Sequence, residues 1–91
     1  MTNKRTVPVG CLCITPTARD TFTCQELLQS LNRFLVGDWG DCDPEDRRTN
    51  DRALINGGRL LAVYSWGEDR QLWIITEADR SVTTLLLPSD Y

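Results

Sequence analysis

The sequence predicts an α+β fold, in which an N-terminal strand and two helices precede a three-stranded antiparallel meander. Apolar residues alternate with other residues through 59–66, 71–77 and 81–87, which is the period of two typical of strands. Two helix-start signals lie between the first strand and the meander. We expect the N-terminal strand to join the meander in a four-stranded sheet packed by helices. A chain of 91 residues forms one small domain, residues 1–91.

The first strand is expected over residues 7–14, after a polar segment, residues 1–6, that we expect to be frayed. Pro8 lies near the start of this strand, where a missing backbone N–H is tolerated. The polar stretch 15–17 ends it. Because Pro16 suits the first turn of a helix, the helix that follows can begin with an additional turn there.

The first helix has a capping box, in which the hydroxyl of Thr23 precedes the carboxylate of Glu26 by three residues. Gly37 stands where a glycine commonly ends a helix. The apolar residues between them fall on one helical stripe, which predicts a core-facing side: Leu27, Leu28, Leu31, Phe34 and Leu35.

The second helix is expected to begin at Asp43 as the N-cap, with Pro44 in the first helical position. Glu45 and Asp46 favour the positive end of its dipole, and the stretch 56–58 stops it. Its apolar residues are confined to 53–55, so we expect a surface helix anchored at its C-terminal end only.

Both faces of the predicted meander carry apolar residues, which is more than a half-exposed sheet needs. One face is expected to take the first helix. The other needs the second helix, a loop or another chain to cover it, which leaves a homodimer open as an alternative.

The net charge of −3 and a pI near 4.7 indicate an acidic protein. Direct nucleic-acid binding is not expected, because phosphate contacts need clustered Lys and Arg and the ten basic residues here are scattered. Lys4 and Arg5 are not followed by the apolar segment of a signal peptide, and no apolar run approaches the length of a membrane span. We therefore expect a cytoplasmic location and no membrane partner.

Four cysteines stand at Cys11, Cys13, Cys24 and Cys42, and the chain has no histidine. Zinc sites prefer paired Cys-x-x-Cys spacing or histidines, which these positions do not offer. We expect reduced thiols, with Cys11 and Cys13 on one face of the first strand and buried as small apolar groups. A disulfide and a metal site remain the alternatives, and no cofactor is expected.

The segment between the two helices concentrates acids: five of the nine residues in 38–46 are Asp or Glu. One interpretation is a loop for a divalent cation, and another is mimicry of nucleic-acid phosphates. A third is a tight turn with Trp39 in the core and Asp43 as a helix cap. As a partner-binding surface, the candidate residues are Asp38, Trp39, Asp41, Asp43, Glu45 and Asp46.

Without histidine, the Cys–His and Ser–His arrangements of nucleophilic catalysis are excluded. The polar turn 76–81 offers an acid/base pair beside an anion-binding arginine, or a plain hairpin in which Asp79 accepts backbone bonds and Arg80 pairs with an acid. For a ribonuclease, the candidate residues are Arg59, Tyr64, Glu77 and Arg80.

The motifs Gly-Asp-Trp-Gly-Asp (37–41), Asn-Gly-Gly-Arg-Leu-Leu (56–61) and the block 73–84 resemble a family of short bacterial proteins. Those proteins are carried on plasmids and integrative elements. The resemblance implies a mobile-element context and no particular reaction.

These observations predict a small acidic binding protein without enzymatic activity, acting stoichiometrically on a protein or nucleoprotein partner such as a host-defence complex. The alternative is a small ribonuclease toxin with the layout of barnase or RelE, which rests on an analogy between folds.

Overall fold

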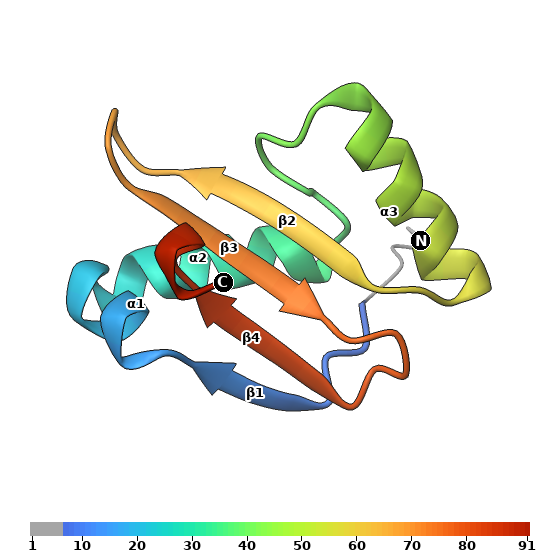
Figure 1. Ribbon diagram of the computed structural model, residues 1–91, viewed down its shortest axis with the longest axis horizontal. Coiled ribbons are helices and arrows are strands. Elements are labelled where there is room, and N and C mark those ends of the chain that lie inside the picture. The colour runs from blue at the N-terminus through green and yellow to red at the C-terminus, as the bar shows by residue number, and fades with distance from the viewer. Residues whose placement is uncertain (1–6) are drawn as a thin grey trace, which may run out of the picture.

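The computed structural model describes residues 7–91 and has the expected α+β architecture, with one four-stranded sheet (Figure 1). The predicted fraying of residues 1–6 lies outside the described residues. The elements follow the chain in this order: β1 (Cys11–Ile14), α1 (Pro16–Thr21), α2 (Cys24–Leu35), α3 (Pro44–Asn56), β2 (Leu60–Ser65), β3 (Gln71–Thr76), β4 (Val82–Leu86) and the 3₁₀ helix η1 (Pro88–Asp90).

The sheet is mixed, with strand order β1-β4-β3-β2. β2, β3 and β4 pair antiparallel, with Ala62 opposite Ile74 and Ile74 opposite Leu85. β1 is the exception, because it lies parallel to β4 with Leu12 opposite Thr83. The prediction of a four-stranded sheet is confirmed, but the sheet is not a simple antiparallel meander. Three helices carry the chain from β1 to the opposite edge, and β4 returns beside β1 in the same direction (Figure 1).

Three α-helices stand where two were expected, because the additional turn at Pro16 is a separate helix. Thr15 caps α1 by accepting a bond from the backbone N–H of Ala18. The chain then becomes extended at Phe22, and Thr23 begins α2 with both bonds of the predicted capping box. Two N-caps so close together leave room for only a short α1.

β1 is shorter than the predicted strand 7–14. Gly10 has φ of +60°, which takes the chain out of the extended conformation just before β1. The backbone N–H of Val7 bonds instead to the carbonyl of Leu35, at the end of α2, over 2.9 Å. The segment before β1 therefore contacts the helix layer rather than the sheet.

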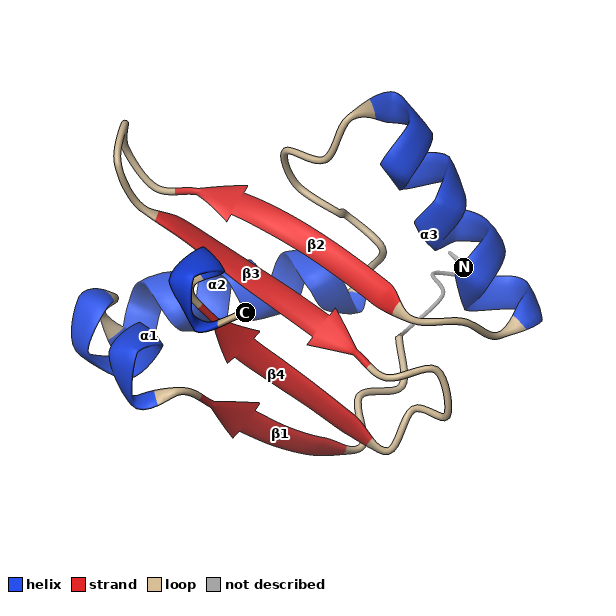
Figure 2. Cartoon of the chain, in the orientation of Figure 1, coloured by secondary structure: helices blue, strands red, loops and turns tan. Residues whose placement is uncertain are grey.

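The core lies between α2 and the sheet, with α2 behind the strands in the view of Figure 2. The buried side chains on this side alternate along the strands, as the sequence predicts, and include Leu60, Ala62, Tyr64, Leu72, Ile74 and Leu85. On the other face, η1 crosses in front of the sheet, and the ring of Tyr91 lies 5.7 Å from that of Trp73. Ile75 and Leu86 are also buried on this face, whereas Leu61 and Val63 are half-buried.

α3 lies beside β2, at the edge of the sheet (Figures 1 and 2). The expectation that it is anchored at its C-terminal end only is wrong. Ala53 is buried near that end, but Asn50, in the middle of the helix, is also buried and bonds to β2. A polar side chain, rather than an apolar stripe, therefore holds the middle of this helix.

Candidate functional site

The acidic loop between α2 and α3 runs along the outer edge of β2. The N–H of Val63 donates to the carbonyl of Trp39 over 3.2 Å, and the N–H of Asp41 donates to the carbonyl of Val63 over 2.6 Å. The carboxylate of Asp41 then accepts from the N–H of Ser65 at 2.8 Å. The loop therefore adds a one-residue parallel bridge, at Gly40, to the edge of the sheet.

Gly40 makes this close approach possible. Its φ is +76°, and a Cβ at this position would collide with the carbonyl oxygen of Val63 and with the ring of Tyr64. The hydroxyl of Tyr64 donates to the carbonyl of Asp38 over 2.7 Å, which fixes the start of the same loop. The loop is thus held to the sheet by both its backbone and a buried tyrosine.

Trp39 is 3% exposed, so the predicted turn with Trp39 in the core is confirmed. Its indole ring meets that of Phe34 edge-on, with centroids 5.5 Å apart. Its Nε1–H donates to Asp51 of α3 over 2.8 Å. A partner could touch Trp39 only if the loop opened, although Trp39 is one of the predicted contact residues.

Among the remaining predicted contact residues, Asp38 and Asp43 have structural roles, and Asp41, Glu45 and Asp46 have exposed carboxylates. Asp38 pairs with Arg33 at 2.7 Å, and this bond holds the pKa of Asp38 below its ordinary value. Asp43 caps α3 by accepting from the N–H of Asp46 at 2.9 Å, which confirms its predicted role as N-cap. Asp41 is bonded to β2 but exposed, and Glu45 and the carboxylate of Asp46 are exposed in the first turn of α3.

A shallow depression of about 220 Å³ lies next to this first turn, between α3 and β2, and Asp46, Thr49, Asn50, Arg59 and Leu61 line it. Asn50 forms its floor by bonding both backbone groups of Leu61. Its amide donates to the Leu61 carbonyl at 2.8 Å, and its oxygen accepts from the Leu61 N–H at 3.1 Å. Asn50 thereby occupies the outward-facing hydrogen bonds of β2, a role that the sequence reasoning missed.

The four residues considered for a ribonuclease do not converge. Tyr64 is fully buried among core residues, and burial raises the pKa of its hydroxyl. Arg59 and Glu77 lie beyond the other end of the β2–β3 pair, about 16 Å away along the strand. Arg59 stacks on the ring of Tyr91 and bonds its hydroxyl at 2.7 Å.

Arg80 also has a structural role, and the expectation that it pairs with an acid is wrong. Its guanidinium donates to backbone carbonyls, at 2.6 Å to Gly58 and at 2.8 Å to Ala53 in the last turn of α3. Cations favour the carbonyl end of a helix, which explains this choice of partner. The hairpin interpretation of the turn is otherwise confirmed, since Asp79 accepts from the N–H of Ser81 at 3.0 Å.

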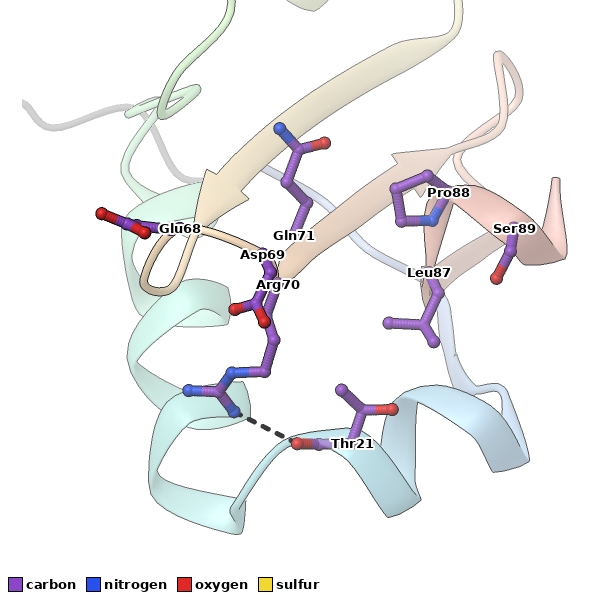
Figure 3. Close-up of a pocket in the computed structure, with 8 residues that line it drawn as sticks. All are labelled: Thr21, Glu68, Asp69, Arg70, Gln71, Leu87, Pro88 and Ser89. Carbon is purple, nitrogen blue, oxygen red and sulfur yellow. Dashed lines mark hydrogen bonds between the residues drawn. The ribbon is translucent and has the colours of Figure 1, made fainter.

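Another depression, of about 390 Å³, lies between the β2–β3 turn, the end of α1 and the start of η1 (Figure 3). Arg70 crosses its floor and donates to the carbonyl of Thr21 at 3.2 Å, while Glu68 points away. The guanidinium also pairs with Glu26 at 2.8 Å, which lowers the pKa of that carboxylate. Arg70 is therefore used within the fold, and none of the predicted site residues lines this depression.

The cysteines differ from expectation. Cys11 and Cys13 are exposed, because they point to the face of the sheet away from α2 and β1 lies at its edge. Cys24 is exposed as well, and only Cys42 is buried, which raises the pKa of its thiol. All four are free thiols, and within residues 7–91 no three Cys, Asp or Glu side chains gather as a metal site would need.

A second feature that the sequence reasoning missed is an apolar groove between β1 and α2, of about 170 Å³. Leu12 and Ile14 line it from β1, and Leu28 lines it from α2. The sequence gave no separate signal for this groove, because the apolar stripe of α2 has the ordinary width of a core-facing side.

Neither the protein-family models nor the curated proteins nor the solved structures with which the chain was compared gave a match. In residues 7–91, no helix combines the length and the apolar character needed to cross a membrane.

Proposed function

We propose that this chain is a small acidic binding protein without enzymatic activity, which acts stoichiometrically on a protein or nucleoprotein partner through the exposed acids around the start of α3. The contact residues would be Asp41, Asp43, Glu45 and Asp46. The resemblance to plasmid-borne and integrative-element proteins suggests a partner such as a host-defence complex and a place in the cytoplasm.

The observation that carries the proposal is the rigid mounting of these acids. The loop is fixed to β2 through Trp39, Asp41 and Val63, and α3 is fixed to β2 through Asn50. A surface held in one conformation loses little conformational entropy on binding, so less of the favourable contact free energy is offset by ordering the loop. Exposed carboxylates on such a surface also steer a basic partner and select against acidic ones.

The positions of the candidate catalytic residues support the same proposal. Tyr64 and Arg80 are both engaged in holding the fold, and Tyr64 has no access to solvent. General acid–base chemistry needs groups within hydrogen-bond reach of one reacting atom. The arrangement of Arg59, Tyr64, Glu77 and Arg80 does not offer that geometry.

The test is affinity capture from the native host with a tagged protein, in which two charge-matched variants are compared. Glu45→Gln with Asp46→Asn neutralises two acids of the proposed contact. Glu68→Gln with Asp69→Asn neutralises two acids of the β2–β3 turn, which are not among the proposed contact residues, and serves as the control. We expect a protein captured by the wild type and the control to be lost with the first variant. Capture that is equal for all three proteins, or cleavage of RNA by the purified wild type, would contradict the proposal.

A further inference from the structure

The two edges of the sheet are treated differently by the fold. At β2, backbone and side-chain groups from outside the sheet bond the outward-facing groups of Leu61, Val63 and Ser65. At β1, no other segment within residues 7–91 pairs along the outer side. Unpaired strand edges are sites for pairing with another chain, and proteins usually block them with charge, proline or a bulge.

The outward-facing backbone groups of β1 can be identified from its pairing with β4. The N–H of Cys11 donates to the carbonyl of Ser81, just before β4, at 2.9 Å, and the N–H of Thr15 donates to that of Leu85 at 3.0 Å. Because successive residues of a strand direct their hydrogen-bonding groups to opposite sides, those of Leu12 and Ile14 face outward. β1 contains no charged residue and no proline.

The side chains of the same two residues border the apolar groove. Leu12 and Ile14 are each 43% exposed, and Leu28 across the groove is 58% exposed. No charged side chain lines the groove. A partner at this edge therefore gains both strand pairing and apolar burial, which is the combination used when a strand is added to a sheet.

We propose that β1 is a homodimer interface, in which two copies pair their β1 strands antiparallel about a two-fold axis. The geometry fixes the register, because Leu12 of each copy lies opposite Ile14 of the other when all four outward-facing residues form bonds. The two sheets then become one eight-stranded sheet, and the two grooves meet with their apolar side chains in contact.

A second copy fits this edge better than an unrelated strand does. The edge and groove are uncharged and apolar, so they match themselves without bringing like charges together. The pairing also stops at two copies, because the other edge of the sheet is already occupied by the acidic loop and Asn50. An antiparallel two-fold contact is closed in the same way.

The area available predicts a weak dimer. A standard interface buries about 800 Å² on each partner, which is about a seventh of the 5683 Å² surface of this chain. β1 has only four residues and α2 only twelve, so we expect their contact to bury less than this standard area and to lie toward the lower limit of about 1,200 Å² in total for specific interfaces. We therefore expect a dissociation constant of about micromolar size. This contact does not include the acidic surface, so the dimer proposal does not depend on the proposed function.

The first test is sedimentation velocity over a range of concentrations, in the presence of a reductant so that no disulfide contributes. We expect the wild type to shift from monomer to dimer and Leu28→Lys to raise the dissociation constant about 10-fold or more, because a charge is then placed in the apolar contact. The control is Ile55→Lys, on α3, which replaces an equally exposed apolar residue and should leave the equilibrium unchanged. A monomer at every concentration, or equal weakening by both variants, would overturn the proposal.

The second test reads the register through Cys13, which lies on the two-fold axis opposite itself. Residues at such a non-hydrogen-bonded position lie about 4.5 Å apart between Cα atoms, which is within the range of a disulfide. Diamide takes up the two protons and two electrons released when the two thiols join. We expect Cys11→Ser with Cys24→Ser, in which Cys13 is the remaining exposed thiol, to give a cross-linked dimer. Cys13→Ser with Cys24→Ser keeps Cys11, which does not face itself in this register, and should give none. No cross-linking of the first variant, or equal cross-linking of both, would overturn the register.

Discussion

Replacing Asn50 with alanine tests how much its two hydrogen bonds to the outer edge of β2 stabilise the fold. Asn50 is 4% exposed, and its amide makes two hydrogen bonds, of 2.8 Å and 3.1 Å, to one residue of β2. Asn50→Ala leaves the backbone N–H of Leu61 without this partner, and its carbonyl keeps only the weak donor of the Cys42 thiol at 3.5 Å. Each unsatisfied buried group costs about 1–3 kcal/mol, and the half-buried position of Leu61 lets water recover part of that cost. We expect a loss of about 2–3 kcal/mol.

That loss is large for a chain of this size. A stability of about 0.05–0.15 kcal/mol per residue gives roughly 5–14 kcal/mol for 91 residues. At about 4–8 °C per kcal/mol, the Tm should fall by roughly 10–20 °C, as followed by circular dichroism. The control is Asn32→Ala, on the exposed side of α2, which should change the free energy of unfolding by about 0.5 kcal/mol or less.

A second substitution at the same position separates the two bonds. Asn50→Asp keeps an acceptor for the N–H of Leu61 but places a carboxylate against its carbonyl oxygen. Protonation restores a donor there, so the deficit of this variant relative to the wild type should shrink as the pH falls toward the pKa of an ordinary Asp, about 3.9, and should be smallest below it. Two results would contradict this role of the hydrogen bonds between Asn50 and Leu61. One is a Tm of Asn50→Ala within about 2 °C of the wild type, and the other is a stability difference between Asn50→Asp and the wild type that does not change with pH.

Three further predictions concern single positions. Gly40→Ala should lower the free energy of unfolding by more than about 3 kcal/mol, because the new Cβ would collide with the backbone of β2. Gly67→Ala, with a similar φ but open space around it, should cost only about 1–2 kcal/mol. Urea unfolding measures both costs, and equal costs would contradict the close approach of the loop to β2. Thr83→Val should lower the free energy of unfolding by about 1–3 kcal/mol, because the buried hydroxyl of Thr76, 2.6 Å away, loses its hydrogen-bond partner. Adding Thr76→Val should recover part of that loss, and purely additive losses in the double variant would contradict the hydrogen bond. The ion pair of Arg70 with Glu26 lowers the pKa of Glu26, so it stabilises the fold above about pH 4.5 and is lost as Glu26 is protonated at lower pH. Arg70→Gln should therefore make the free energy of unfolding fall less steeply below about pH 4.5 than it does in the wild type. An equally steep fall in both proteins would contradict this.

Local signals in the sequence predicted the local structure well. The capping box at Thr23 and the N-cap at Asp43 both form as expected, because each depends on residues within one helical turn. Trp39 enters the core as one interpretation of the loop required. The three strands of the C-terminal part pair antiparallel, since short turns leave neighbouring strands few other arrangements.

Contacts between distant segments could not be predicted in the same way. The parallel pairing of β1 with β4 depends on where three helices deliver the chain. Arg80 bonds to carbonyls of α3 rather than to an acid, because the fold brings the end of that helix to the turn. Asn50 lies in a helix with little apolar character, and nothing near it in the sequence indicates that its amide reaches β2.

The same limit applies to the candidate sites. The acidic segment was recognisable from composition, but which of its carboxylates are free depends on Arg33 and on the edge of β2. The groove beside β1 was not recognisable, because a strand at the edge and a strand in the centre of a sheet can have the same sequence pattern. Exposure of Cys11 and Cys13 follows from that edge position.

Amide hydrogen exchange, measured residue by residue by NMR at low and high protein concentration, tests most directly the claim that one sheet edge is sealed and the other is an interface. We expect the amides of Leu61, Val63 and Ser65 to be protected at every concentration, because the acidic loop and Asn50 bond them. Those of Leu12 and Ile14 should exchange quickly in dilute solution and slow down as the concentration rises. Fast exchange along the β2 edge, or exchange at Leu12 and Ile14 that does not depend on concentration, would contradict this view of the two edges.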